Sequence, residues 1–429
     1  MDQSSGPLRG LPDRLLERLS RVTTPGRRFI PEIDGMRFVA IAAVVVVHGV
    51  STVYSLAGGS ARFGWTPQND VVWNLGQEGV WGVQLFFVIS GLVLGVPFAQ
   101  RHLGDGRRVG LVPYYARRLT RLEPPYLVGL TLALIGAVWI GGVSLGELLP
   151  HFLSGLFYAH GSTYSSLNPV LLVAWSLEVE VQFYLLAPAL ACVFAIGDRR
   201  LRRAAIVGAG CLAIVLQTLY MTDGSRVSYS LLAQIQYFLA GFLLADVYFT
   251  EWDGERPAKR WIWDVVASAV VVVWVWSAYG AAHAPILLWM GRTVDRATIR
   301  WVLFPFLAYV LMTTGFKGPA SSRFLSNRWV YTIGGMCYSI YLTHTLVIDL
   351  ARKVTLHAVF GGNLSVELLV QLALVGPVVV VAGAAFFVLI ERPCMNPRWP
   401  QDLVGWFADR PRWDRVRLDS RCLDDKRRT

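Results

Sequence analysis

The stretch IDGMRFVAIAAVVVVH, residues 33–48, decides the class of fold to which this chain belongs. Every residue between Arg37 and His48 is apolar. At about 100° of rotation and about 1.5 Å of rise per residue, these two side chains share one helix face and lie roughly 16 Å apart along the axis. An arginine at the edge of lipid and a histidine deeper inside it cost free energy, so each needs a partner or a function. The alternative is an arginine that reaches lipid headgroups and a histidine bonded to a neighbouring helix.

Further apolar segments repeat this pattern along the whole chain. Of its 429 residues, 54% are hydrophobic and 16% are charged, and about 17–25 apolar residues suffice to cross a bilayer. Helices satisfy their own backbone hydrogen bonds in lipid, so the predicted fold class is all-α integral membrane, a bundle of about ten transmembrane helices. The predicted spans are 38–56, 79–99, 122–141, 171–196, 204–221, 229–249, 262–282, 299–315, 332–351 and 367–390.

The net charge of +11 is distributed very unevenly between the loops. If the N-terminus lies in the cytoplasm, only about seven of the 40 lysines and arginines fall outside, as the positive-inside rule expects. Those on the outer side are Arg62, Arg226, Arg292, Arg296, Arg300, Arg352 and Lys353. The pattern predicts a multi-pass protein of the cell (cytoplasmic) membrane with both termini cytoplasmic. The basic charge therefore favours contact with the lipid bilayer, and nucleic acid is not an expected partner.

The chain divides into one large unit with two flanking segments. Residues 1–30 form a cytoplasmic N-terminal lead, either a short interfacial helix or a solvated basic tail. Residues 31–395 form the transmembrane domain, and residues 396–429 form a basic cytoplasmic tail. The first span is preceded by about 37 residues and lacks a small-residue cleavage site, so we interpret it as a signal anchor. The five cysteines show no metal-type spacing, so no metal site and no disulfide framework are predicted.

Two motifs belong to the second and third spans, one inside the second span and one at the start of the third. GVQLFFVISG, residues 82–91, has small residues that allow close helix packing, with polar side chains able to hydrogen-bond across the interface. RRLTRLEPPY, residues 117–126, places Arg118 and Arg121 three residues apart on one helix face. Paired guanidiniums suit phosphate recognition, although ordinary positive-inside charge explains the pair equally simply.

Three further motifs carry polar groups into apolar helices. WSLEVEVQFYLL, residues 175–186, places Glu180 where it requires a cationic or proton-sharing partner, and a structural ion pair is an open alternative. YSIYLTH, residues 338–344, brings a second intramembrane histidine, His344. The tenth span closes with Glu391-Arg392-Pro393.

In this order the motifs resemble the acyltransferase family 3 membrane proteins, which O-acylate sugars and other hydroxyl-bearing molecules. The resemblance covers roughly residues 30–395. The chain departs from the family pattern at Gln84, Glu123 and Val181. Some relatives carry an appended extracytoplasmic esterase-like domain, and the length of this chain predicts the stand-alone form.

The resemblance implies an O-acyltransferase that uses acyl-CoA, with acetyl-CoA as the expected form, as a co-substrate rather than a bound cofactor. Arg37, Arg118 and Arg121 would then bind the phosphates of the donor. His48 would be the general base or the acyl-accepting residue, since imidazole is mostly neutral at pH 7. The catalytic residues would be His48 and Glu180, and the substrate-binding residues Trp175 and His344. The partner would be a carbohydrate or glycosylated acceptor.

Two other classes of protein also place polar residues in many spans. A transporter or exporter of a lipid-linked or glycosylated compound is the main alternative. Transporters often show two related halves with matching broken helices, and the chain shows no such symmetry. A non-catalytic scaffold would leave Arg37, His48, Arg118 and Glu180 without a role. The sequence therefore favours an enzyme.

Overall fold

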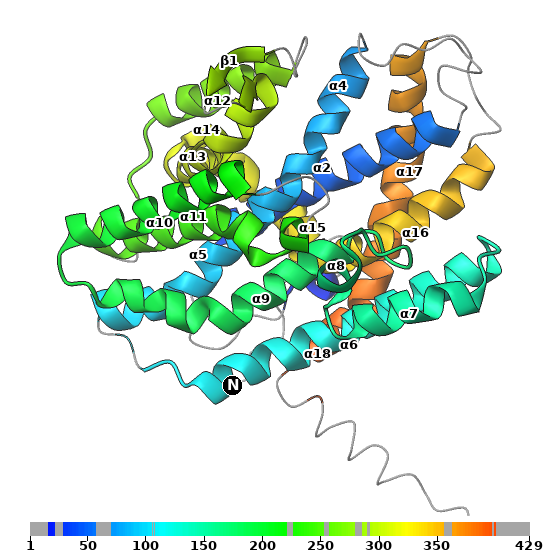
Figure 1. Ribbon diagram of the computed structural model, residues 1–429, viewed down its shortest axis with the longest axis horizontal. Coiled ribbons are helices and arrows are strands. Elements are labelled where there is room, and N and C mark those ends of the chain that lie inside the picture. Colours follow the sequence, from blue (N-terminus) through cyan, green and yellow to red (C-terminus); the bar gives the residue numbers. More distant parts are fainter. Residues whose placement is uncertain are drawn as a thin grey trace, which may run out of the picture.

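A computed structural model shows a helical bundle with one short hairpin (Figure 1). It describes residues 16–21, 29–56, 70–104, 106, 108–220, 226–252, 257–278, 285–289, 292–355, 363–396 and 399. The first half of the bundle contains α2 (Pro31–Leu56), α4 (Val71–Gln77), α5 (Gly82–Leu103), α6 (Leu111–Trp139), α7 (Leu145–Leu156), α8 (His160–Tyr164), α9 (Ala174–Leu190) and α10 (Arg199–Tyr220). The second half contains α11 (Leu231–Thr250), α12 (Ile262–Ala278), β1 (Pro285–Trp289), β2 (Arg292–Asp295), α13 (Arg296–Lys317), α14 (Pro319–Leu325), α15 (Arg328–Gly335), α16 (Cys337–Thr355), α17 (Leu364–Phe386) and α18 (Arg392–Cys394).

Each of the ten predicted spans overlaps a helix: α2, α5, α6, α9, α10, α11, α12, α13, α16 or α17. Within the described residues, seven helical stretches are long and apolar enough to cross a membrane. The apolar parts of α12 and α13 are shorter, and α16 ends in a charged turn that contains Arg352 and Lys353. The chain is thus a multi-pass membrane protein. The count of ten and the orientation of the termini stay predictions.

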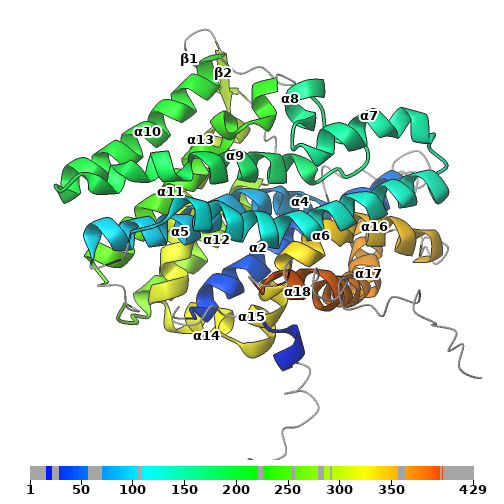
Figure 2. The ribbon, with the colours of Figure 1, turned by 90° about the horizontal axis from the view of Figure 1, so that it is seen from below.

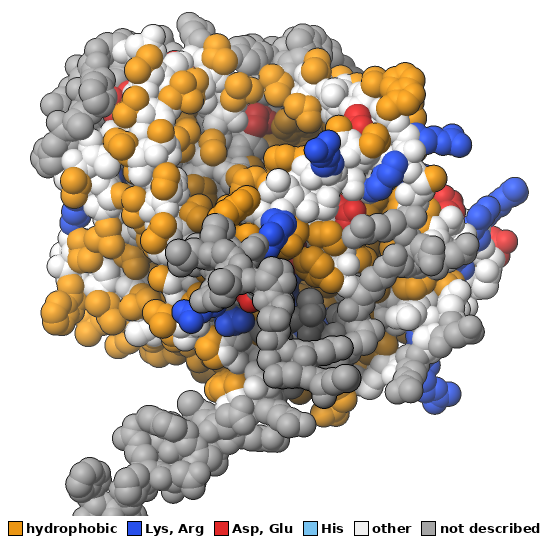
Figure 3. Space-filling view, turned by 180° about the vertical axis from the view of Figure 1, so that it is seen from behind, with side chains coloured by type: hydrophobic (Ala, Val, Ile, Leu, Met, Phe, Trp, Pro, Cys, Tyr) orange, Lys and Arg blue, Asp and Glu red, His pale blue; other side chains and the backbone are white. Residues whose placement is uncertain are grey.

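The surface and the interior are both apolar, as this class requires. Hydrophobic side chains are spread over most of the described part of the face shown in Figure 3. Helix α10 exposes Leu201, Leu212 and Leu216. Such a surface is unfavourable in water and matches lipid. The division into 1–30, 31–395 and 396–429 stays a prediction, since most residues of the two flanking segments lie outside the described part.

Helix α2 lies in the middle of the bundle, among α5, α15, α16 and α17 (Figures 1 and 2). Its close contact with α15 depends on Gly334, where a Cβ atom would lie only 1.8 Å from the carbonyl oxygen of Asp34. Any side chain at that position would push the helices apart. The contact holds the first turns of α2, and therefore Arg37, against the start of α16.

Helices α5 and α11 form the most extensive helix pair of the bundle. A Cβ atom on Gly91 would lie 2.2 Å from the carbonyl oxygen of Phe238, and one on Gly241 would lie 2.2 Å from that of Val88. The small residues thus allow the backbones to touch, as the motif predicted. With one face of α5 fixed in this way, another of its faces, which carries Ser90, is available to line a cavity.

Candidate functional site

A cavity of about 290 Å³ lies between α2, α5, α6, α9, α16 and the segment 391–395. Among its lining residues are five arginines and two glutamates, which are Arg21, Arg37, Arg117, Arg118, Arg121, Glu180 and Glu391. Its remaining wall is largely apolar, with Val83, Phe86, Phe87, Val93 and Leu94 contributed by α5. The cavity therefore joins a strongly cationic region to an apolar one.

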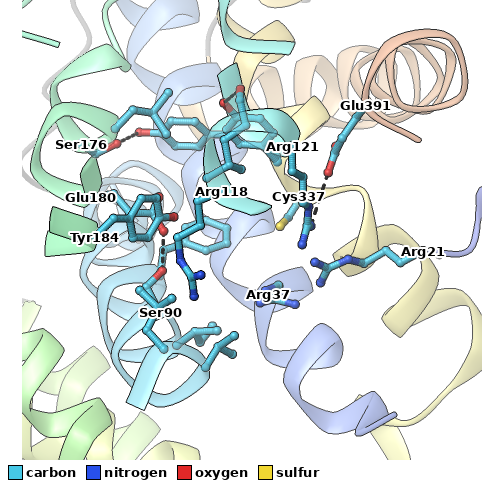
Figure 4. A pocket seen from close by; sticks show the side chains of 18 of the residues that line it. Arg21, Arg37, Ser90, Arg118, Arg121, Ser176, Glu180, Tyr184, Cys337 and Glu391 are labelled. Atoms are coloured by element: carbon cyan, nitrogen blue, oxygen red, sulfur yellow. Dashed lines mark hydrogen bonds and ion pairs between the residues drawn. The ribbon is translucent and has the colours of Figure 1, made fainter. Parts of the chain in front are cut away.

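At the cationic end, the guanidinium groups of four arginines point into a common space (Figure 4). Arg37 donates a hydrogen bond to Asp34 on its own helix, and Arg21 donates to the same carboxylate oxygen at 2.8 Å. Burial lowers the pKa of Arg21, but the surrounding acidic groups, Asp34 foremost and then Cys337 and Glu391, more than offset this, so the pKa is raised. Asp34 is 5% exposed. One buried carboxylate thus orients two cationic side chains.

Two more arginines come from α6, one helical turn apart. Arg118 donates to the carbonyl oxygen of Tyr114 at 3.0 Å, and its guanidinium carbon lies 3.8 Å from the centre of the Tyr114 ring. Stacking on an aromatic face and a backbone hydrogen bond together restrict the guanidinium to one orientation. A nitrogen of Arg121 lies 3.8 Å from a carboxylate oxygen of the buried Glu391. The second oxygen of Glu391 accepts from the Ser339 hydroxyl at 2.6 Å.

Glu180 lies beside the apolar wall of the same cavity. The hydroxyl of Ser90 donates to its carboxylate at 2.5 Å. The sequence suggested helix packing for Ser90, and the structure shows that it also hydrogen-bonds a carboxylate of the cavity. Tyr184, one turn further along α9, lines the same cavity. The partner that this intramembrane carboxylate requires is thus a hydroxyl group, that of Ser90.

At the end of the cavity away from the arginines, Ser176 and Tyr341 share a hydrogen bond of 2.6 Å. The Tyr341 ring lies 5.7 Å from the His344 ring, which in turn lies 5.1 Å from the His48 ring, measured between ring centres. The two histidines are therefore neighbours just beyond the cavity rather than part of its lining. One aromatic contact separates them from it.

The hydrogen bonds of His344 identify its tautomer. Its Nδ1 lies 2.7 Å from the carbonyl oxygen of Tyr341 and 3.2 Å from that of Ile340. Carbonyl oxygens only accept, so Nδ1 carries the proton and Nε2 is left as an acceptor. This Nε2 is buried and has no hydrogen-bond partner among the described residues. A buried acceptor without a partner costs free energy, which points to a ligand or a functional group at this position.

Trp175 does not line the cavity. Its ring meets Phe87 at 6.3 Å and Tyr229 at 6.5 Å. Among the described residues, no group of three or more histidine, cysteine, aspartate or glutamate side chains is arranged to hold a metal ion. The structure thus brings together Arg37, Arg118, Arg121 and Glu180, and it pairs His48 with His344 close by.

Sequence reasoning missed several residues of this region. Arg21 lies in a segment that an exposed tail would explain as well, and Cys337, which directly precedes the motif 338–344, received no role in the site; both line the cavity. Glu178 is fully buried and accepts from the backbone nitrogens of His160 and Gly161 at 3.1 and 2.9 Å. It therefore fixes the short helix α8 to α9. No local pattern connects residues so far apart, so only the fold could reveal this contact.

The fold and the cavity define a multi-pass membrane protein with an arginine-lined internal site. A family model described as an acyltransferase domain matches residues 30–391, so the chain belongs to the acyltransferase family 3. No solved structure matches it.

Three curated relatives show how far the similarity extends. The chain is 28% identical to the peptidoglycan O-acetyltransferase OatA of Listeria monocytogenes over 357 residues, 78% of this chain and 52% of that protein. It is 23% identical to the O-acetyltransferase OatA of Staphylococcus aureus over 77% of this chain and 52% of that protein. It is 25% identical to the putative peptidoglycan O-acetyltransferase YrhL of Bacillus subtilis over 77% of this chain and 50% of that protein. The chain spans about half the length of these relatives.

Proposed function

We propose that this protein is a membrane O-acetyltransferase that moves an acetyl group from acetyl-CoA to a hydroxyl group of a carbohydrate, with peptidoglycan as the first acceptor to test. The family and the names of the relatives favour this activity over transport. One observation supports it above the others: a single cavity runs from an arginine cluster to within one aromatic contact of a histidine pair.

The cationic end suits the nucleotide part of the donor. Coenzyme A carries several negative phosphate charges, and arginine forks bind phosphate in pairs of hydrogen bonds. Arg37 and Arg118 are already held in place by Asp34 and Tyr114, so little side-chain entropy is lost on binding. The phosphates would be held here while the pantetheine arm extends along the apolar wall of α5.

The histidine pair would then meet the thioester. His48 removes the proton from the acceptor hydroxyl as its oxygen attacks the thioester carbonyl carbon. The new C–O bond forms, the C–S bond breaks, and the departing thiolate of coenzyme A takes the proton from the imidazolium. The acceptor nitrogen of His344, fixed by the Nδ1 hydrogen bond, holds His48 or the hydroxyl in the required orientation. Glu180, tied to Ser90, would orient the donor inside the cavity.

The test uses purified full-length protein in nanodiscs with [¹⁴C]acetyl-CoA and soluble peptidoglycan fragments. We expect label to appear in the fragments, and mass spectrometry to show an acetyl ester on a sugar hydroxyl. Label on a different carbohydrate alone would overturn peptidoglycan as the acceptor while leaving the reaction class intact. If no acetyl group reaches any carbohydrate acceptor offered, the proposed activity is wrong.

A further inference from the structure

We propose that Arg21 is a phosphate ligand of the donor site, so that residues 16–21 are part of the site rather than a separate leader. The inference rests on the proposed function, because the phosphates are those of the acyl-CoA donor. It adds a residue that lies before the region matched by the family model, residues 30–391. The match to the family model therefore does not include Arg21.

The segment is fixed to the bundle by its apolar side chains. Leu16 is 5% exposed, and Leu19 packs against the hydrophobic core. The carbonyl oxygen of Glu17 accepts a hydrogen bond from Arg392 at 3.4 Å. Between these contacts, the side chain of Arg18 is exposed. The apolar residues thus hold the segment in place, and within it only Arg21 lines the cavity.

The path of the Arg21 side chain depends on the glycine at the end of α15. A Cβ atom on Gly335 would lie 3.1 Å from Cγ and 3.2 Å from Cδ of Arg21. The aliphatic part of Arg21 therefore crosses the bare backbone of Gly335, which also lines the cavity. Beyond it the guanidinium reaches Asp34 and points toward Arg37 and Arg121 (Figure 4).

The local charge balance indicates an anionic ligand. Arg21 and Arg37 donate to the same oxygen of Asp34, so the single negative charge of Asp34 is shared by two positive charges. Arg121, close to both, faces Glu391, which is already hydrogen-bonded to Ser339. Like charges gathered in a half-buried space repel one another and are stabilised when a multiply charged anion binds between them. A purely structural counter-ion for Asp34 would be redundant, because Arg37 already fills that role.

The arginine cluster is suited to binding a phosphate group. In a membrane protein such a phosphate can come from the nucleotide of the donor or from the headgroup of an anionic lipid. The position of Arg21 inside the cavity, with the residues of the donor path, favours the nucleotide. Since one charge-assisted hydrogen bond is worth about 1.5–3 kcal/mol, its loss weakens binding by roughly tenfold or more.

The experiment measures binding of coenzyme A and of S-acetyl-pantetheine, which lacks the nucleotide phosphates, to full-length wild type, Arg21→Gln, Arg21→Lys and Arg18→Gln. Titrations are run in detergent and in nanodiscs with and without phosphatidylglycerol. We expect Arg21→Gln to raise the Kd for coenzyme A about tenfold and to leave that for S-acetyl-pantetheine unchanged. Arg21→Lys, which keeps the charge but loses the fork, should fall between wild type and Arg21→Gln. Arg18→Gln should bind like wild type.

Each other outcome counts against the inference. Equal weakening of both ligands would show that Arg21 has only a structural role, and the melting temperature of each variant reports that directly. An effect of Arg21→Gln confined to nanodiscs with phosphatidylglycerol would assign the residue to a lipid headgroup. If wild type binds coenzyme A and Arg21→Gln binds it equally well, only the role of Arg21 is wrong. If the wild-type protein binds no coenzyme A, then acyl-CoA is not the donor, and the role of Arg21 inferred here is wrong as well.

Discussion

Replacing Arg118 by glutamine removes one guanidinium from the cationic end of the cavity while keeping a polar side chain with the same first three carbon positions. In the native protein this group is held by the Tyr114 carbonyl at 3.0 Å and by the Tyr114 ring at 3.8 Å. Its hydrogen bond and its closest ring contact, both with Tyr114, lie within its own helix, and its contact with the Tyr184 ring of α9 is longer, at 5.8 Å, so we expect the bundle to tolerate the change. The loss should therefore appear in donor binding rather than in folding.

The magnitude follows from the contact that is lost. A hydrogen bond to a charged group contributes about 1.5–3 kcal/mol, and each 1.4 kcal/mol changes an equilibrium constant about tenfold. Arg118 is half-buried, so solvent screening favours the lower end of this range. We expect the Kd for coenzyme A to rise about tenfold, and its dependence on salt to become weaker because one phosphate contact is missing.

Isothermal titration of coenzyme A into the purified variant, at low and at high salt, measures both quantities. Arg108→Gln is the matched control, because Arg108 is exposed just before α6 and does not line the cavity. An unchanged Kd for Arg118→Gln, with an unchanged salt dependence, would show that Arg118 serves only the positive-inside charge pattern. Equal weakening by Arg108→Gln would attribute the effect to overall charge instead.

Three further changes test the packing and electrostatics around the site. Gly91→Ala should lower the free energy of unfolding by about 1–3 kcal/mol, because the added Cβ would meet the backbone of α11. Gly210 has open space around it, so Gly210→Ala should leave the free energy of unfolding unchanged. Thermal unfolding of the two variants measures the difference. Glu391→Gln should lower the melting temperature, because it removes a buried partner of Arg121. It should not weaken coenzyme A binding, because it also removes a negative charge from the cavity. Weaker binding of coenzyme A would contradict this prediction. Burial and the neighbouring His151 lower the pKa of His160 from 6.5, so neutral His160 stabilises the fold above pH 6.5 and this stability is lost as the pH falls. His160→Gln should therefore reduce the change of melting temperature with pH between about pH 5 and 7. A pH profile of the melting temperature equal to that of wild type would contradict the lowered pKa of His160.

The sequence was sufficient to predict the helical class and three of the arginines at the cationic end of the cavity, Arg37, Arg118 and Arg121. Arg37 and His48 lie on one helix because the apolar run between them spans three turns. Arg118 and Arg121 line the cavity together because residues three apart share a face of α6. Patterns of this kind act within one helix, and a local sequence contains them completely.

What the sequence could not supply depends on contacts between distant segments. The hydrogen bond from Ser90 to Glu180 joins residues on two helices, and the contact of Arg21 with Asp34 depends on how α15 and α2 meet at Gly334. The surroundings of the His344 acceptor nitrogen, which has no hydrogen-bond partner among the described residues, depend on the packing of α2 against α16, which brings His48 to the His344 ring. Helix packing decides all three, and apolar periodicity does not encode it residue by residue.

The central claim is that the arginine-lined cavity binds the donor and that the histidine pair beyond it performs the transfer. The most direct measurement uses one preparation of His48→Ala to determine both the Kd for acetyl-CoA and the rate of acetyl transfer to the carbohydrate acceptor. The control is His102→Ala, because His102 is exposed at the end of α5. We predict that His48→Ala binds acetyl-CoA within about twofold of wild type and transfers at least about a hundredfold more slowly, as expected for loss of a general base. His102→Ala should match wild type in both. Transfer by His48→Ala at the wild-type rate would contradict the claim.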